Sequence, residues 1–413
     1  MNARIICVAS AKGGSGKTSL TATLGTFLSN LGKRVLLVDA DYATNGLTLF
    51  YVKDIRVEAE LLRSKSKSPR GLFEGLSNRQ FCDITPLGEK LSIIPATYNL
   101  QLPESIDARS APNYFTILFK ELRDAYDYIF IDAQAGLDEM AQIAMSRQVS
   151  DEVVIVSEFD PMSAAGVERM KAMLRDDLTY ERTWVLLNKI LPEFATTFSD
   201  FLEVAKYLNP IPWDAEVVRA YARRRLAINT ETGNEYTISA MQTLKGLCGD
   251  EIHEALAEWV QSRAAVIRQP LDQQYSDAEK ELKTLLYQRA MALRRKSKFQ
   301  LSFIAASAFF AIGASYFVYR SSFFSELFSI LNINSSLWAF SLIPVSFVWA
   351  FYIIARLLFQ SPLFERPDVD RQIEDERLDR QSEVLKEKLK KLEVLKSLDA
   401  ESLLVQRISK TQN

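Results

Sequence analysis

The chain has 413 residues, enough for two or three domains. Its 50 basic and 52 acidic residues leave a net charge of −2, so no global positive field indicates a nucleic-acid partner. Three dispersed cysteines (Cys7, Cys82 and Cys248) argue against a disulfide scaffold and fit a reducing compartment, and a single histidine, His253, effectively excludes histidine-dependent nucleophilic catalysis.

The N-terminus shows no secretory signal pattern. Met1 to Arg4 leads directly into an apolar run, residues 5–9, that is shorter than a secretory apolar region and precedes a glycine-rich loop. We therefore expect the first part of the chain to stay in the cytosol.

Residues 1–262 alternate short β-rich runs with longer amphipathic stretches. Candidate strands are 5–9, 34–39, 91–95, 128–132, 152–157 and 183–188, with helical patterns at 19–31, 114–124 and 164–176. Most of the β-rich runs are continuously apolar, as is typical of parallel strands buried on both faces. The alternation predicts an α/β domain with a doubly wound, mostly parallel sheet.

The composition changes after residue 262. We expect 263–298 to form a helical linker, because its part 271–298 has no Gly or Pro and is rich in helix formers. Residues 299–319 are then 21 positions without charge, and 337–359 are 23 positions with one charge, at Arg356. A membrane span needs about 20 apolar residues. This favours two transmembrane helices joined by a short external loop, 320–336, over a buried helical hairpin.

Charge flanking these segments predicts their orientation. Basic residues precede the first segment (Arg294, Arg295, Lys296 and Lys298) and close the second (Arg356 and Arg366), whereas the loop between them holds one Arg and one Glu. Positive charge favours the cytoplasmic side. We therefore expect a protein of the inner (cytoplasmic) membrane with two spans and with both termini in the cytoplasm.

The last part of the chain, 368–407, is highly charged and has a heptad pattern. Leu378, Leu385 and Leu392 recur every seven residues, with Leu389 between the last two. This spacing predicts a cytoplasmic coiled coil, which packs on the preceding helix or on a second subunit. A single solvated helix is the alternative.

A glycine-rich loop carries the strongest local motif. Lys12-Gly13-Gly14-Ser15-Gly16-Lys17-Thr18-Ser19 lies between the strand at 5–9 and the helix at 19–31. Backbone amides of such a loop and the N-terminus of the helix attract phosphate. Lys17 would reach the β- and γ-phosphates, and the Thr18 hydroxyl would bind Mg²⁺.

This loop resembles the deviant Walker A motif, KGGxGKT, of the ParA/MinD superfamily of P-loop ATPases. The first glycine of the ordinary P-loop pattern would fall at Ser10 or Ala11, so the ordinary pattern is not met. The resemblance implies that residues 11–19 bind ATP. It also implies that Lys12 reaches the phosphates held by a second copy, so that dimerisation depends on ATP.

Further motifs follow in the family's order between residues 3 and 225. Asp39 and Asp41 match the D-x-D of switch I, which implies that both help to hold Mg²⁺ and that Asp41 orients the attacking water. Asp132 matches the Walker B metal residue, and the Gly136 amide matches the γ-phosphate sensor. Asn188 and Pro212 resemble the residues beside adenine. The implied cofactors are ATP and Mg²⁺, and the implied catalytic residues are Lys12, Lys17 and Asp41.

Two departures from the family pattern bear on the rate of hydrolysis. Tyr42 and the run Ala133-Gln134-Ala135 stand where the family usually has prolines. Neither change removes a ligand of phosphate or metal, so we expect nucleotide binding to persist. The resemblance implies that ATP hydrolysis is slow, because no ATPase of this family is fast.

The leading hypothesis is a membrane-anchored dimer switch that uses ATP to recruit or position a protein partner on the cytoplasmic face of the lipid bilayer. The alternative is a membrane-tethered, ParA-like ATPase that binds DNA without sequence preference through a basic cluster, Arg219, Arg223, Arg224 and Arg225, with Lys65, Lys67 and Arg70. We expect that cluster to be a solvated helix face or a lipid contact instead.

Two related classes fit the sequence poorly. A bacterial tyrosine kinase has its spans before the ATPase and ends in a tyrosine cluster, whereas no tyrosine follows Tyr352 here. A chaperone of the arsenical-pump type would have a methionine-rich groove and a CxxC pair, and neither is visible. The sequence does not indicate the partner or the biological process.

Overall fold

The computed structural model describes residues 2–99, 108–191, 205–228, 234–320 and 362–410, with a few isolated positions between the last two ranges. The chain divides into two compact units. Unit 1 comprises Met1–Ile267 together with Asp399–Asn413, and unit 2 comprises Arg268–Leu398. The last residues of the chain thus belong to the same unit as the first.

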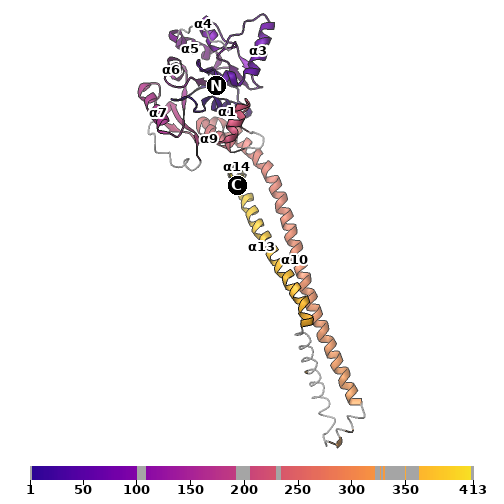
Figure 1. Ribbon diagram of the computed structural model, residues 1–413. Coiled ribbons are helices and arrows are strands. Elements are labelled where there is room, and N and C mark those ends of the chain that lie inside the picture. The colour runs from indigo at the N-terminus through magenta and orange to yellow at the C-terminus, as the bar shows by residue number, and fades with distance from the viewer. Residues whose placement is uncertain are drawn as a thin grey trace. The chain divides into compact units, whose positions relative to one another are not determined.

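Unit 1 is built on a nine-stranded sheet (Figure 1). Its strands in chain order are β1 Arg4–Ala9, β2 Val35–Ala40, β3 Thr85–Pro86, β4 Leu91–Ile94, β5 Tyr128–Ala133, β6 Glu152–Ser157, β7 Thr183–Ile190, β8 Lys206–Tyr207 and β9 Ile211–Pro212. The spatial order is β3-β4-β2-β5-β1-β6-β7-β8, with β9 paired to β7, and every pairing is parallel except β3 with β4. The predicted α/β class with a mostly parallel sheet is confirmed.

Helices cover both faces of this sheet. In chain order they are α1 Lys17–Asn30, α2 Gly46–Phe50, α3 Val52–Ser64, α4 Leu72–Asn78, α5 Ala111–Leu122, α6 Glu139–Met145, α7 Pro161–Met173, α8 Ala215–Ala222, α9 Glu235–Cys248, the start of α10 His253–Arg320, and α14 Ala400–Lys410. Alternate residues of β1 show the two layers. Ile6 and Val8 enter one core cluster with α1 and α9, and Ile5 and Cys7 enter the other with α5 and α6. All four side chains are fully buried, which explains the continuous apolar runs of the sequence.

Residues 263–298 are helical as predicted, but the helix starts before them. α10 begins at His253 and continues through Pro270, so the predicted linker 263–298 is part of one helix. Trp259, Val260 and Ala264 of α10 are buried in unit 1. Tertiary burial of this kind supplies most of the stability of a helix, so the helix forms well before Pro270 even though proline disfavours an interior position.

In unit 2, α13 Pro362–Ser397 runs antiparallel to α10 (Figure 1). Lys396 pairs with Asp272 at 2.8 Å, and Arg289 pairs with Asp379 at 2.9 Å. Leu385 and Leu392 of the predicted heptads are buried. Of the two packing partners expected for this helix, the one in the structure is α10 of the same chain.

The C-terminal segment is not one continuous helix, contrary to the prediction for 368–407. α13 ends at Ser397, and α14 begins at Ala400 as a separate helix of unit 1. The Asp399 carboxylate accepts a hydrogen bond from the Ser402 amide and so caps α14. Leu403 and Leu404 are fully buried, and Glu401 pairs with Lys245 of α9 at 2.9 Å. The apolar contact made by Leu404 with unit 1 explains the break.

Within the described ranges, no helix is both long enough and apolar enough to cross a membrane. The predicted segment 299–319 belongs to α10, but most of its side chains lie outside the described part of the structure. The predicted segment 337–359 and most of the predicted loop 320–336 lie outside the described residues.

Candidate functional site

The glycine-rich loop connects the end of β1 at Ala9 to the start of α1 at Lys17. Gly14 and Gly16 have φ angles of 84° and 94°, in the region that favours glycine. Gly16 is the N-cap residue of α1, and a Cβ atom there would collide with the Asn188 side chain. The loop therefore places the first amides of α1 at the carboxyl ends of the parallel strands, an arrangement that favours binding of a phosphate.

Two aspartates lie side by side next to this loop. Asp39 near the end of β2 is the register partner of Asp132 on β5, and both are fully buried. Asp39 is hydrogen-bonded: its Oδ2 accepts from the Thr48 amide at 2.7 Å and from the Thr48 hydroxyl at 2.6 Å. Neither oxygen of Asp132 accepts a hydrogen bond of ordinary geometry from a described residue. A buried carboxylate without donors is costly unless a cation or a ligand compensates it.

Burial shifts the titration of both carboxyls. Loss of solvent raises the pKa of Asp132 to about 8, the neighbouring Asp39 adds to the rise, and Lys17 and Thr18 act in the opposite direction. Loss of solvent also raises the pKa of Asp39 to about 6, against the hydrogen bonds from Thr48. Cations favour the charged form of such groups, so the pair is suited to stabilise a divalent ion.

The residues around Asp132 fit Mg²⁺ bound together with a nucleotide. In the described part of the chain, no three Cys, His, Asp or Glu side chains gather as a direct metal-binding group. Mg²⁺ usually keeps several waters and takes only one or two carboxylates plus phosphate oxygens. Thr18 at the start of α1 and the unpartnered Asp132 are the residues suited to hold it.

Asp41 occupies a tight turn after β2. Its Oδ1 accepts hydrogen bonds from the amides of Ala43 at 3.1 Å and Thr44 at 2.9 Å, and its Oδ2 accepts from the Thr44 hydroxyl at 2.6 Å. The amide of Ala43 also contacts Gln134 Oε1 at 3.3 Å. Gln134 stands where the ParA/MinD family usually has a proline, and it contacts this turn after β2. The sequence did not predict this contact.

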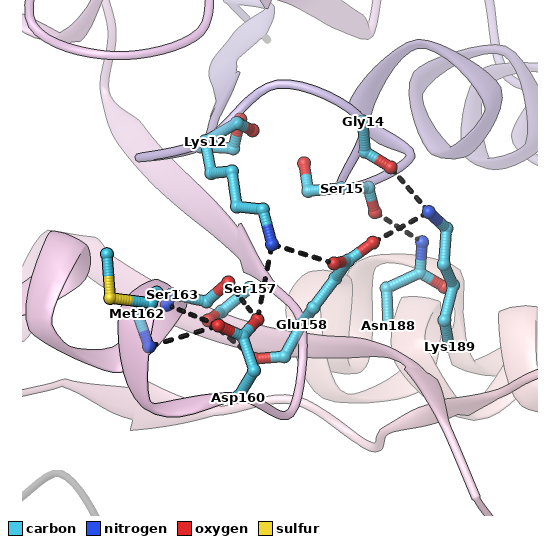
Figure 2. Close-up of polar contacts among 11 residues, drawn as sticks. Lys12, Gly14, Ser15, Ser157, Glu158, Asp160, Met162, Ser163, Asn188 and Lys189 are labelled. Carbon is cyan, nitrogen blue, oxygen red and sulfur yellow. Dashed lines mark hydrogen bonds and ion pairs between the residues drawn. The ribbon is translucent and has the colours of Figure 1, made fainter.

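Lys12 projects from the loop toward two carboxylates (Figure 2). Its Nζ lies 3.4 Å from Glu158 Oε2 and 3.5 Å from Asp160 Oδ2. Asp160 and, next, Glu158 raise the pKa of Lys12. The side chain is 52% exposed, so it is held at the surface of its own subunit and is accessible from outside.

The structure places the other predicted residues as follows. The Gly136 amide donates to Ser10 O at 2.8 Å, and the Asn188 side-chain amide donates to Ser15 O at 2.8 Å. Both residues thus contact the loop that precedes α1. Pro212 lies on β9, in register with Ile190 of β7. Thr48, Glu158, Asp160 and Lys189 contact the predicted site residues but were not predicted, because no local motif marks them.

Replacing Thr48 with valine is expected to lower the free energy of unfolding of the nucleotide-free protein by about 2–4 kcal/mol. The Thr48 hydroxyl donates to Asp39 and accepts from the Ala96 amide at 2.8 Å, so valine removes two buried hydrogen bonds. Chemical denaturation measures the change.

Thr183→Val is the matched control, because the Thr183 hydroxyl is also buried but has no hydrogen-bond partner among the described residues. We expect that variant to be neutral or slightly stabilised. Equal losses for the two variants would show that Thr48 does not support Asp39.

Known proteins resemble the first half of the chain. A family model described as an AAA domain matches residues 3–181. The septum site-determining protein MinD of Synechocystis is 29% identical over 194 residues, and MinD of Bacillus subtilis is 28% identical over 188 residues. These alignments cover 46% and 45% of this chain and 66% and 64% of the relatives, so the chain matches just under two thirds of the length of each.

Solved structures also resemble this chain. MinD of Pyrococcus horikoshii, solved in complex with Mg-ADP, is 24% identical and aligns with a TM-score of 0.47 over 60% of this chain and 98% of that chain.

Proposed function

Because the N-terminal part of this chain is a P-loop ATPase domain of the ParA/MinD family, we propose that the protein is an ATP-driven dimer switch. In this proposal Mg·ATP binding joins two copies through their glycine-rich loops, and hydrolysis separates them. The observation that carries the proposal is Asp132, a buried carboxylate that accepts no hydrogen bond of ordinary geometry from the described residues and lies close enough for Lys17 to stabilise its charge.

In this proposal, residues of the glycine-rich loop and of the neighbouring strands have separate roles in ATP binding and hydrolysis. Lys17 at the start of α1 would neutralise charge on the β- and γ-phosphates. Thr18 and Asp132 would hold Mg²⁺, which would supply charge neutralisation for phosphoryl transfer to water. Asp39 adds negative charge beside Asp132. Asp41 leaves its turn to orient the attacking water, and Lys12 leaves Glu158 for the phosphates held by the second copy.

Isothermal titration of the full-length protein tests nucleotide binding directly. We expect Mg·ATP to bind and Lys17→Ala to weaken binding by about 10- to 100-fold, because one charged hydrogen-bond donor to phosphate is lost. Lys90→Ala is the control: Lys90 is exposed and donates to Gly32 O, away from the loop. Absence of measurable Mg·ATP binding by the unaltered protein would contradict the proposal.

Contacts within unit 1 offer a route from the nucleotide site to the C-terminal helices. The Phe27 ring of α1 packs edge-on against Trp259 of α10, with centroids 5.0 Å apart. The Thr23 hydroxyl of α1 lies 3.1 Å from the Tyr236 hydroxyl of α9, the helix that pairs with α14 through Glu401. A shift of α1 on nucleotide binding would therefore bear on both chain segments that lead to unit 2.

We also propose that residues 299–319 and 337–359 anchor the protein in the cytoplasmic membrane. The support is their length and their single charged residue, Arg356, together with the antiparallel pairing of α10 and α13. At the end of this pair beyond Arg289 and Asp379, α10 continues into residues 299–319, and α13 begins at Pro362, which follows the second segment in the sequence. A permanent anchor would confine the switch to changes of partner binding or of oligomeric state.

Extraction of native membranes with alkaline carbonate tests the anchor. We expect the full-length protein to remain in the pellet, because two spans hold it through the apolar core and not through charge. Recovery of the protein in the supernatant, beside a peripheral marker protein, would contradict the anchor while leaving the nucleotide switch standing.

The function of the switch at the membrane would be to recruit or position a protein partner. The relatives named septum site-determining proteins favour such a function. Binding to DNA remains the second candidate, because Arg223, Arg224 and Arg225 are exposed just after α8. Filter binding to unrelated duplexes would separate the two: affinity that falls steeply with salt and disappears when the three arginines are replaced would support DNA.

A further inference from the structure

Lys189 has an unusual backbone conformation beside the nucleotide site. It lies near the end of β7, where the register with β9 is irregular, and its φ angle is 59°. A long side chain seldom adopts this left-handed conformation, which costs of the order of 1–2 kcal/mol per residue. The conformation directs the Lys189 ammonium to the glycine-rich loop.

The Lys189 ammonium makes two polar contacts there (Figure 2). It donates a hydrogen bond to the carbonyl oxygen of Gly14, and it pairs with Glu158 Oε1 at 2.7 Å. Glu158 in turn contacts Lys12 through its other oxygen, at 3.4 Å. One carboxylate is therefore shared between two lysines, and one of these lysines also holds the loop backbone.

The second carboxylate near Lys12 has other partners. Asp160 is the N-cap residue of α7 and accepts from the amides of Met162 and Ser163, each at 3.0 Å, and from the Ser163 hydroxyl. The charge of Asp160 is thus satisfied whether or not Lys12 is near. Among the described residues, Glu158 has only Lys12 and Lys189 as cationic partners.

We propose that Lys189 is a positioning residue that makes the release of Lys12 possible. This inference rests on the proposed dimer switch, in which Lys12 must leave Glu158. With Lys189 in place, Glu158 keeps a cation after Lys12 departs. Without Lys189, Glu158 would depend on Lys12 alone, so Lys12 would be held in its own subunit and the dimer would be weakened.

The exposure of Lys12, Glu158 and Lys189 sets the expected size of the effect on dimerisation. The side chains of Lys12, Glu158 and Lys189 are 52%, 24% and 41% exposed, and water therefore screens each ion pair. A screened pair changes an equilibrium by about threefold. Because two Lys12 side chains are released for every dimer, Lys189→Met is expected to weaken ATP-dependent dimerisation about tenfold.

Sedimentation of the full-length protein with Mg·ATP tests this in four variants: Lys189→Met, Lys189→Arg, Glu158→Gln, and Lys189→Met combined with Glu158→Gln. Arginine keeps the charge, so dimerisation should stay within about threefold of the unaltered protein. Glutamine cannot hold Lys12 by charge, so the double variant should recover most of the affinity lost in Lys189→Met. A double variant as weak as Lys189→Met would overturn the inference.

Binding of Mg·ADP to the monomer distinguishes a role of Lys189 in releasing Lys12 from direct phosphate binding. If Lys189 bound phosphate directly, Lys189→Met would weaken Mg·ADP binding to the monomer as strongly as it weakens dimerisation, and this result would also overturn the inference. Lys189→Asn, which tolerates the left-handed backbone, replaces Lys189→Met if the methionine variant does not fold. If the unaltered protein forms no ATP-dependent dimer, the proposed function itself fails; if it dimerises and Lys189→Met dimerises equally well, only the role of Lys189 fails.

Discussion

Asp132→Asn is expected to stabilise the nucleotide-free protein and to slow ATP hydrolysis. Burial raises the pKa of Asp132 to about 8, so at pH 7 folding requires this carboxyl to take up a proton. Relative to the ordinary pKa of an aspartate, this uptake costs about 4 kcal/mol. Asparagine avoids the cost, and we expect unit 1 to gain about 2 kcal/mol or more and its thermal midpoint to rise by several degrees. Mg²⁺-supported hydrolysis should fall by about 10- to 100-fold, because the carboxylate that orients the metal's water shell is lost.

The raised pKa of Asp132 also predicts how the stability of the folded protein depends on pH. The pKa of Asp132 is raised in the folded state, so the folded protein binds more protons than the unfolded chain between about pH 4 and pH 8. Stability should therefore decrease as pH rises through this window. The decrease should be smaller in Asp132→Asn. Thermal scans at several pH values, without nucleotide or Mg²⁺, measure both effects.

Asp39→Asn is the matched control for Asp132→Asn. Asp39 is equally buried, but its Oδ2 accepts two hydrogen bonds from Thr48. Replacing this carboxylate weakens charged hydrogen bonds, so we expect little gain or a loss of stability. If both variants gained stability equally, the unpartnered state of Asp132 would not be the cause. If Asp132→Asn hydrolysed ATP at the unaltered rate, Asp132 would have no part in metal binding.

Lys12→Ala is expected to abolish the ATP-dependent dimer and to leave Mg·ATP binding by the monomer within about threefold of the unaltered protein. The Lys12 side chain is half-exposed, and its ammonium pairs with only Glu158 and Asp160 among the described residues, so its removal should not disturb the fold. The dimer, in contrast, loses two cations that would neutralise triphosphate charge at its centre. Titration calorimetry measures binding, and light scattering measures the mass.

Glu158→Gln is the companion to Lys12→Ala, because it removes one of the two charges that hold Lys12 in place. We expect its dimer to form at least as readily as that of the unaltered protein. A dimer that persisted in Lys12→Ala would show that this lysine does not act across the interface, whatever its contacts in the monomer.

Six of the nine strands were predictable from the sequence, and their ends differ from the prediction by at most two residues. These strands are buried on both faces, so apolar runs mark them. The strands Thr85–Pro86, Lys206–Tyr207 and Ile211–Pro212 have two residues each and carry Pro or Lys. Their pairing depends on neighbouring strands, and no local sequence pattern predicts it.

The candidate nucleotide site was predictable where a motif fixes its members on adjacent elements. Lys17, Asp39 and Asp132 follow from the glycine-rich loop and from two apolar strands that end in aspartate, and the structure brings them together. Lys189 and Glu158 could not be predicted. Their contacts depend on a strand irregularity and on the packing of β6 and β7 beside the loop, which involve residues more than 140 positions away from Lys12.

The central claim is tested most directly by the mass of the full-length protein in detergent, measured by sedimentation with Mg·ATP and with Mg·ADP. The Asp41→Ala variant, in which hydrolysis should be slowed, serves to hold the triphosphate. We expect twice the mass of one chain with Mg·ATP and the mass of one chain with Mg·ADP. The same mass in both nucleotides, for the unaltered protein and for Asp41→Ala, would contradict an ATP-driven dimer.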